Sequence, residues 1–155
     1  MNPMRLRSSP LLQEANFSTM IEITDKTIDT QKIIDAASKL NAGAVNVFIG
    51  TVRNVANDKK VTRLEYEAYE PMAVAEIRKI FEEATERWKL LGWAFSHRVG
   101  ILVPGEPAVV AAISTSHRKE SFEATEFIMN QLKLRVPIWK KEVFEGGEEW
   151  VSARP

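Results

Sequence analysis

The hydrophobic positions near the start of the regular part of the chain predict a short strand followed by a helix. Ile21 and Ile23 alternate with polar neighbours, which is typical of a strand. Asp29 or Thr30 can cap the helix that follows. Gly43 is the expected stop of this helix. Its apolar stripe consists of Ile33, Ile34, Ala37 and Leu40.

The middle of the chain predicts a strand pair and a long helix. Residues 44–52 read as a buried strand, because eight of them are apolar or small and only one is an amide. The polar loop 54–60 then leads into 61–69, which alternates as the returning strand of a hairpin. Pro71 opens a helix that Gly92 is expected to end. The apolar face of this helix consists of Val74, Ile77, Phe81, Ala84, Trp88 and Leu91.

The last third predicts two strands, a helix and a terminal hairpin. The strands are 93–99 and 108–115, and the helix covers 118–134 until Val136-Pro137 breaks it. Residues 138–151 form the hairpin, with its turn at the Gly-Gly pair. Phe122, Met129 and Leu132 follow one side of the helix. The order β-α-β-β-α-β-β-α-β-β predicts an α+β fold with mainly antiparallel pairing.

Composition and charge exclude several classes of protein. Lys plus Arg and Asp plus Glu number 21 each, and this zero net charge disfavours a nucleic-acid binder. There is no cysteine, so thiolate metal sites and a cysteine nucleophile are excluded, and two histidines disfavour a histidine-rich metal site. The longest apolar run, 108–113, is far shorter than the ~20 residues that a membrane helix needs. We expect no membrane span, no metal and no cofactor.

The N-terminal segment 1–19 lacks a clear period. Its two arginines and its serines resemble a transit peptide, but Glu14 and the missing apolar core of a secretory signal argue against targeting. A disordered leader, or a start at Met20, is the preferred interpretation. We therefore expect one domain over 20–155.

A local basic cluster is the first candidate for chemistry. His117 and Arg118 stand where a helix is predicted to begin, and the free N–H groups of a helix N-terminus attract phosphate or carboxylate. The guanidinium of Arg118 can bind such a group through two hydrogen bonds. The alternative is a pair of solvent-facing side chains that only begin a helix.

Lysines near the end of the chain are the second candidate. Lys133 shares a helix side with Phe122 and Met129. Its ammonium is therefore either desolvated, which suits it for proton transfer, or it reaches water while the stem packs on the apolar side chains. In a strand, Lys140 and Lys141 face opposite sides, so one of them can turn toward Lys133. The alternative for this pair is an edge strand guarded by lysines.

Arg53, after the strand 44–52, opens a loop, where functional residues often lie. The alternative interpretation is that Arg53 is an ordinary surface arginine. His97-Arg98 lies within a predicted strand and is given a structural role.

Five segments together resemble the large subunit of molybdopterin synthase. They occur in the family's order and cover about residues 20–154. The segments are FIGTVRN (48–54), LEYEAYEPMA (64–73), HRVG (97–100), STSHRKESFEATEFIMNQLKLRVPIWKKE (114–142) and WVSAR (150–154).

The resemblance implies a sulfurtransferase of molybdenum cofactor biosynthesis in the cytoplasm. Members of this family insert two dithiolene sulfurs into cyclic pyranopterin monophosphate (precursor Z) and so form molybdopterin. The sulfur comes from the thiocarboxylate at the C-terminal Gly-Gly of a small ubiquitin-like subunit. Two large subunits form the central dimer of a heterotetramer. The implied fold is an α/β hammerhead with a smaller α+β subdomain.

The resemblance also implies roles for individual residues. Lys133 and Lys140 match the catalytic lysines and also contact the substrate. Arg154 matches a residue that reaches the site from the partner subunit. The remaining expected substrate contacts are Arg53, His117, Arg118, Lys141 and Glu142. We expect the positive side chains at 53, 117–118, 133 and 140 to converge on one anion-binding pocket in the folded protein.

Two other functions use the same residues. An enzyme of phosphate-ester or acyl transfer requires a carboxylate base, for which Glu126 and Glu142 are the candidates. A scaffold that docks a ubiquitin-like partner requires no catalytic lysine. Substitution of Lys133 by alanine separates an enzyme from a scaffold, because only an enzyme then loses turnover.

Overall fold

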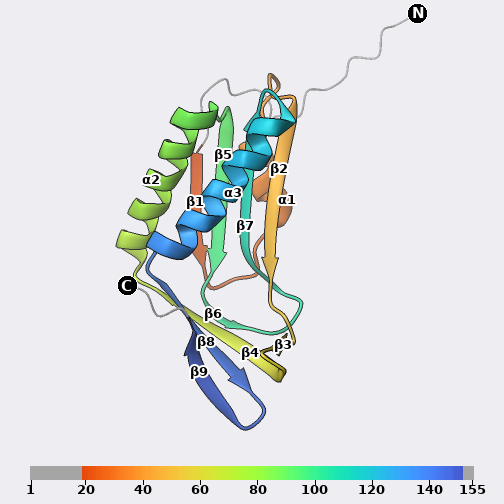
Figure 1. The fold of residues 1–155 in the computed structure, drawn as a ribbon, viewed down its shortest axis with the longest axis vertical. Coiled ribbons are helices and arrows are strands. Elements are labelled where there is room, and N and C mark those ends of the chain that lie inside the picture. Colours follow the sequence, from red (N-terminus) through yellow and green to blue (C-terminus); the bar gives the residue numbers. More distant parts are fainter. Residues whose placement is uncertain (1–18, 152–155) are drawn as a thin grey trace, which may run out of the picture.

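The computed structural model describes residues 19–151 and confirms the predicted mixed α+β class with mostly antiparallel pairing (Figure 1). Arg154 and nearly all of the expected leader 1–19 lie outside the described residues, and Thr19 already belongs to the first strand. The elements are β1 (Thr19–Thr24), α1 (Thr30–Ala37), β2 (Ala44–Thr51), β3 (Val55–Ala56), β4 (Lys59–Ala68), α2 (Glu70–Trp88), β5 (Gly92–Arg98), β6 (Gly100–Leu102), β7 (Pro107–Thr115), α3 (Arg118–Arg135), β8 (Ile138–Phe144) and β9 (Gly147–Val151).

A four-stranded sheet in the order β1-β5-β7-β2 carries the helices. The pair β1–β5 is parallel, and the pairs β5–β7 and β7–β2 are antiparallel. Helices α2 and α3 cover one face and α1 covers the other (Figure 1). Alternation along β5 sends Trp93 and Phe95 toward α2 and α3, and sends Ala94 toward α1.

A second sheet lies beyond the end of the first (Figure 1). Its order is β3-β4-β8-β9, and β6 pairs with β4. The long antiparallel pair of β4 and β8 forms its centre. A small hydrophobic cluster joins this sheet to the first, because residues from strands of both sheets belong to it. Its members are Val52, Ala56, Val61, Leu64, Leu102 and Ala108, with Tyr66 packed against them.

The strand predicted at 44–52 is confirmed as β2, but the prediction that it is buried is wrong. β2 lies at the edge of its sheet, with β7 on one side. Three large apolar side chains of β2 remain exposed: Val45 by 42%, Phe48 by 39% and Ile49 by 44%. An apolar run shows that a strand has two apolar faces, but it does not show whether other elements cover them.

Both predicted helix stops at glycine are also wrong. Helix α1 ends at Ala37, so Leu40 of the expected stripe lies beyond it and is 76% exposed. Helix α2 ends at Trp88, where Lys89 takes the left-handed conformation that usually ends a helix. Gly92 instead begins β5, and a Cβ there would lie 2.5 Å from the carbonyl oxygen of Ala37.

Two short strands were not expected from the sequence. The loop 54–60 contains β3 and a tight turn in which Asn57 and Asp58 have positive φ. β6 consists of three residues between β5 and β7. Strands this short contain too few positions for alternation to be recognised.

Candidate active site

The break between α3 and β8 holds two of the predicted site residues. Lys133 lies in the last turn of α3, and Lys140 lies seven positions later in β8. The side chain of Lys133 is exposed, so this chain by itself favours the solvated alternative for its ammonium. Arg135 fixes the end of α3 to α2, because its guanidinium lies 3.3 Å from Glu76 Oε2 and 2.7 Å from Glu83 Oε2.

The two lysines of β8 point to opposite faces, as alternation predicts. Lys140 lies opposite Tyr66 in the register with β4, on the face where Ile138 packs against the main core. Lys140 therefore points toward the junction of the two sheets. Lys141 lies opposite Glu65 on the other face.

Lys141 is held by carboxylates. Its Nζ lies 2.6 Å from Glu65 Oε2 and 3.6 Å from Glu148 Oε2, and 5.5 Å from the ring centre of Trp150. The hydrogen bond with Lys141 lowers the pKa of Glu65, and the same bond raises the pKa of Lys141. Both groups stay charged near neutral pH.

Lys140 has a looser partner. Its Nζ lies 3.8 Å from Glu142 Oε1, beyond hydrogen-bond distance. The Glu142 residue is only 9% exposed. Burial, and secondarily the charge of Glu142, raises the pKa of the nearby Tyr66 hydroxyl to about 12. Tyr66 therefore remains protonated near neutral pH.

His97 stands behind Tyr66 at the end of β5. The two rings meet edge-on with their centres 5.0 Å apart. His97 Nδ1 donates a hydrogen bond of 2.8 Å to the carbonyl oxygen of Arg98. Burial lowers the pKa of His97 to about 4, so its ring is neutral at physiological pH. This supports the structural role that the sequence assigned to His97, and it places that role beside Tyr66.

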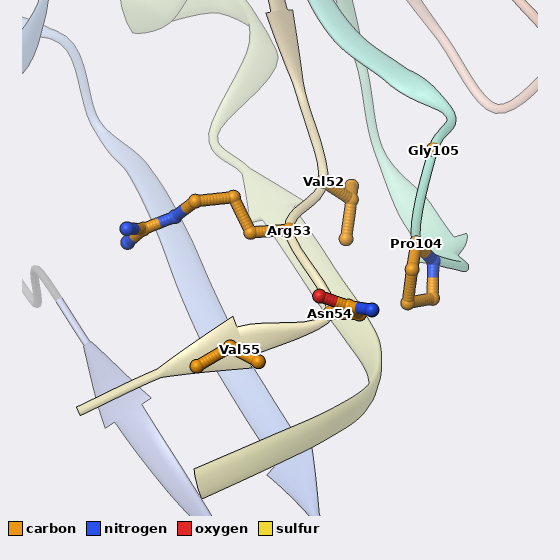
Figure 2. A pocket seen from close by; sticks show the side chains of 6 residues that line it. All are labelled: Val52, Arg53, Asn54, Val55, Pro104 and Gly105. Atoms are coloured by element: carbon orange, nitrogen blue, oxygen red, sulfur yellow. The ribbon is translucent and has the colours of Figure 1, made fainter. Parts of the chain in front are cut away.

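Arg53 lines an open hollow of about 570 Å³ at the end of β2 (Figure 2). Two backbone hydrogen bonds fix the walls of the hollow: Gly105 N–H donates to Val52 O, and Val52 N–H donates to Glu106 O. The Arg53 side chain extends away from Pro104 and Gly105 (Figure 2). Arg53 is exposed, as expected for a loop arginine.

His117 and Arg118 begin α3, as predicted, but they lie far from Lys133. His117 is the N-cap residue, and Arg118 and Lys133 are separated by 15 positions of one helix. At ~1.5 Å per residue this spacing corresponds to about 22 Å. Arg53 is also distant from His117 and Arg118, since β2 begins opposite Thr115 and ends opposite Pro107. One chain does not gather the predicted residues into one pocket.

The described residues therefore contain two basic groups. The first, which we call the junction group, consists of Lys133 and Lys140, which flank the break between α3 and β8, whereas Arg53 lies at the end of β2. The second, the helix-start group, consists of His117 and Arg118. Within the described part of the chain, Arg53, Arg118 and Lys133 have no carboxylate partner, so their charges are available to an anionic ligand.

Residues 19–151 show no group of three or more histidine, aspartate or glutamate side chains that could hold a metal ion. Among these residues no helix is both long and apolar enough to cross a membrane.

Comparisons with known proteins identify the family. The model of the family described as MoaE protein matches residues 23–135. The molybdopterin synthase catalytic subunit of Bacillus subtilis is 50% identical over 131 residues, which cover 84% of this chain and 83% of that protein. The human protein of the same name is 38% identical, covering 92% of this chain and 84% of its own.

A solved structure agrees with these relatives. The crystal structure of molybdopterin synthase from Staphylococcus aureus has a TM-score of 0.80 and 38% identity, and the match covers 84% of this chain and 95% of that one. A complex of subunits 1 and 2 of the molybdopterin-converting factor from Helicobacter pylori shares the fold at 23% identity and a TM-score of 0.63. The chain belongs to the MoaE family of molybdopterin synthase catalytic subunits, enzymes of molybdenum cofactor biosynthesis.

Proposed function

We propose that the chain converts precursor Z to molybdopterin by inserting two sulfurs delivered as a thiocarboxylate on a small ubiquitin-like subunit. The observation that carries this proposal is the position of Lys133 and Lys140 on either side of the α3–β8 break. One is solvated and the other has only a carboxylate at 3.8 Å. Neither ammonium is locked in a short ion pair, so both can meet an anionic substrate.

The charges of the substrate fit the basic groups. A cyclic phosphate and a thiocarboxylate are both anions, and guanidinium and ammonium groups stabilise them and the charge that develops during attack. We assign phosphate binding to Arg53 and Arg118. Lys133 and Lys140 transfer protons and hold the tetrahedral and thioester-like intermediates.

Two chains are needed to complete the site. The helix-start group lies about 22 Å from Lys133 by the ~1.5 Å rise of a helix, too far for one small substrate to bridge. We propose that His117 and Arg118 of one chain meet the junction group of a second chain, and that Arg154 also reaches the site from the partner subunit. The exposed apolar side chains of the β2 edge support self-association, because such edges commonly pair.

Lys141 and Glu142 remain proposed substrate contacts. Glu142 lies on the Lys140 face, whereas Lys141 reaches the substrate only if its ion pair with Glu65 opens. The cytoplasmic location expected from the sequence also stays a prediction.

Reconstitution tests the proposal. The purified chain, precursor Z and a small subunit bearing a C-terminal thiocarboxylate are mixed, and molybdopterin is measured by mass spectrometry. We expect product with the thiocarboxylate and none with the ordinary carboxylate. Absence of product, under conditions in which a relative's catalytic subunit succeeds with the same reagents, contradicts the proposal.

Substitution of Lys133 distinguishes an enzyme from a scaffold. The Lys133→Ala chain is expected to keep its fold and its affinity for the small subunit while losing product formation. Unchanged product formation would instead favour the docking scaffold considered from the sequence.

A further inference from the structure

We propose that Tyr66 is a positioning residue for Lys140, with His97 bracing the Tyr66 ring. The inference rests on the proposed function, because it matters for turnover only if Lys140 takes part in the reaction. It concerns two side chains, one on β4 and one on β5, that meet at the junction of the two sheets.

The register places Tyr66 beside Lys140. The two residues lie directly opposite each other in the antiparallel pair of β4 and β8. Side chains opposite each other in such a pair have Cβ atoms roughly 5 Å apart and stand on the same face. The stem of Lys140 and the Tyr66 ring are therefore cross-strand neighbours, and lysine stems commonly pack on apolar surface of this kind.

The end of the Lys140 side chain has a second neighbour. Glu142 follows two positions later on the same face, and its carboxylate lies 3.8 Å from the ammonium. A separation of this length attracts the ammonium without locking it in a hydrogen bond. The Tyr66 ring on the neighbouring strand and the Glu142 carboxylate farther along the same strand together restrict the directions that Lys140 can take.

The Tyr66 ring is itself held in place. The His97 ring meets the Tyr66 ring edge-on at 5.0 Å, and a hydrogen bond to the Arg98 carbonyl oxygen fixes the His97 ring. Edge-on aromatic contacts of this kind stabilise a fixed arrangement. Because the His97 ring is neutral and contacts Tyr66, its contribution is steric.

Lys141 provides the contrast. It leaves the opposite face of the strand and is held at 2.6 Å by Glu65. A short ion pair already sets the position of Lys141, whereas Lys140 has only the Tyr66 ring and the more distant Glu142 carboxylate.

The test compares substitutions of the two tyrosines of the chain. Tyr66→Leu removes the aromatic ring, and Tyr66→Phe retains the ring without its hydroxyl. Tyr69→Phe is the matched control, because Tyr69 is 56% exposed. For molybdopterin formation we expect Tyr66→Leu to lower kcat about tenfold with little change in KM, in line with the cost of a misplaced catalytic group. We expect Tyr66→Phe and Tyr69→Phe to stay within about twofold of wild type.

A second readout does not depend on turnover. Lysines are labelled by reductive ¹³C-methylation, and the Lys140 signal is assigned from its loss in Lys140→Arg. We expect Tyr66→Leu to shift and broaden this signal and Tyr66→Phe to leave it nearly unchanged. His97→Gln removes the brace while keeping Tyr66, and it should shift the same signal in the same direction. This variant also serves if Tyr66→Leu does not fold.

The outcomes separate the two proposals. An unmoved Lys140 signal in both Tyr66→Leu and His97→Gln overturns the positioning role. A loss of kcat in Tyr66→Phe as large as that in Tyr66→Leu also overturns it, because the effect would then belong to the hydroxyl. A shifted signal in a protein that forms no molybdopterin supports the positioning role and contradicts the proposed function.

Discussion

Lys140 and Lys141 are neighbours in sequence, yet their side chains leave β8 on opposite faces. Lys140 points to the junction of the two sheets opposite Tyr66, and Lys141 pairs with Glu65 on the other side. Adjacent positions in a strand always differ in this way. The two residues can therefore be altered separately to distinguish a reactive lysine from a structural one.

Substitution of each lysine by methionine is expected to give different losses. Lys140→Met should lower turnover by at least about 100-fold, the typical contribution of a group that transfers protons. Lys141→Met should lower the melting temperature, because it leaves Glu65 without its 2.6 Å partner, and as the loss of a proposed substrate contact it should lower turnover much less than Lys140→Met does. Steady-state kinetics and thermal melts check both. If Lys141→Met loses as much turnover as Lys140→Met, the assignment of roles by face is wrong.

Mixing two inactive variants tests whether the site is shared between chains. His117→Ala and Lys133→Ala chains are unfolded together and refolded, or coexpressed. A mixed dimer then contains one site in which both residues are intact. With random pairing, activity should return to about one quarter of wild type.

A site contained in one chain gives the opposite result, because every site in the mixed dimer then retains one defect. The matched control mixes two variants of the same group, Lys133→Ala and Lys140→Ala. That mixture should stay inactive under the shared-site arrangement.

The β2 edge supplies a prediction on self-association. Ile49→Lys and Phe48→Lys place a charge on side chains that are 44% and 39% exposed, so the monomer should tolerate them. If β2 contributes to the dimer, each should shift the chain toward monomer in sedimentation-velocity experiments. Thr51→Lys, at an exposed position of the same strand, is the control for charge alone. Unchanged dimerisation of all variants would place the contact elsewhere.

The low pKa of His97 predicts a loss of stability in mild acid. In the folded protein His97 stays neutral down to about pH 4, whereas its ordinary pKa is 6.5. Between these values the unfolded chain binds the extra proton, so the free energy of unfolding falls as the pH is lowered through this window. The loss is at most about 3 kcal/mol. Urea unfolding at pH 7 and pH 5 measures it, and His97→Gln should flatten the difference.

Much of the fold could be predicted from the sequence, because most elements are long enough to show their period. Helix α3 begins at Arg118 as expected, and alternation correctly put Lys140 and Lys141 on different faces. The predictions that failed concern burial, which depends on the neighbouring elements of the folded chain. The apolar run of β2 lies at an edge, and Phe122, expected on an apolar helix side, is 63% exposed.

The site was harder to predict because it depends on distances across the fold. The separation of Arg118 from Lys133 could have been recognised, since the sequence already predicted one helix between them. The contact of Tyr66 with His97 could not, because neither the register of β4 with β8 nor the approach of β5 is encoded by local periodicity.

The continuity of α3 has a consequence for how the family can vary. The helix is a rigid spacer with a basic group at each end, and one added residue turns everything beyond it by about 100° and moves it by about 1.5 Å. Insertions or deletions inside this helix would therefore misdirect Lys133 and would also displace buried residues such as Ala124 and Ile128 from the core. Changes of length should instead be tolerated in the exposed Asn57-Asp58 turn, whose residues only reverse the chain.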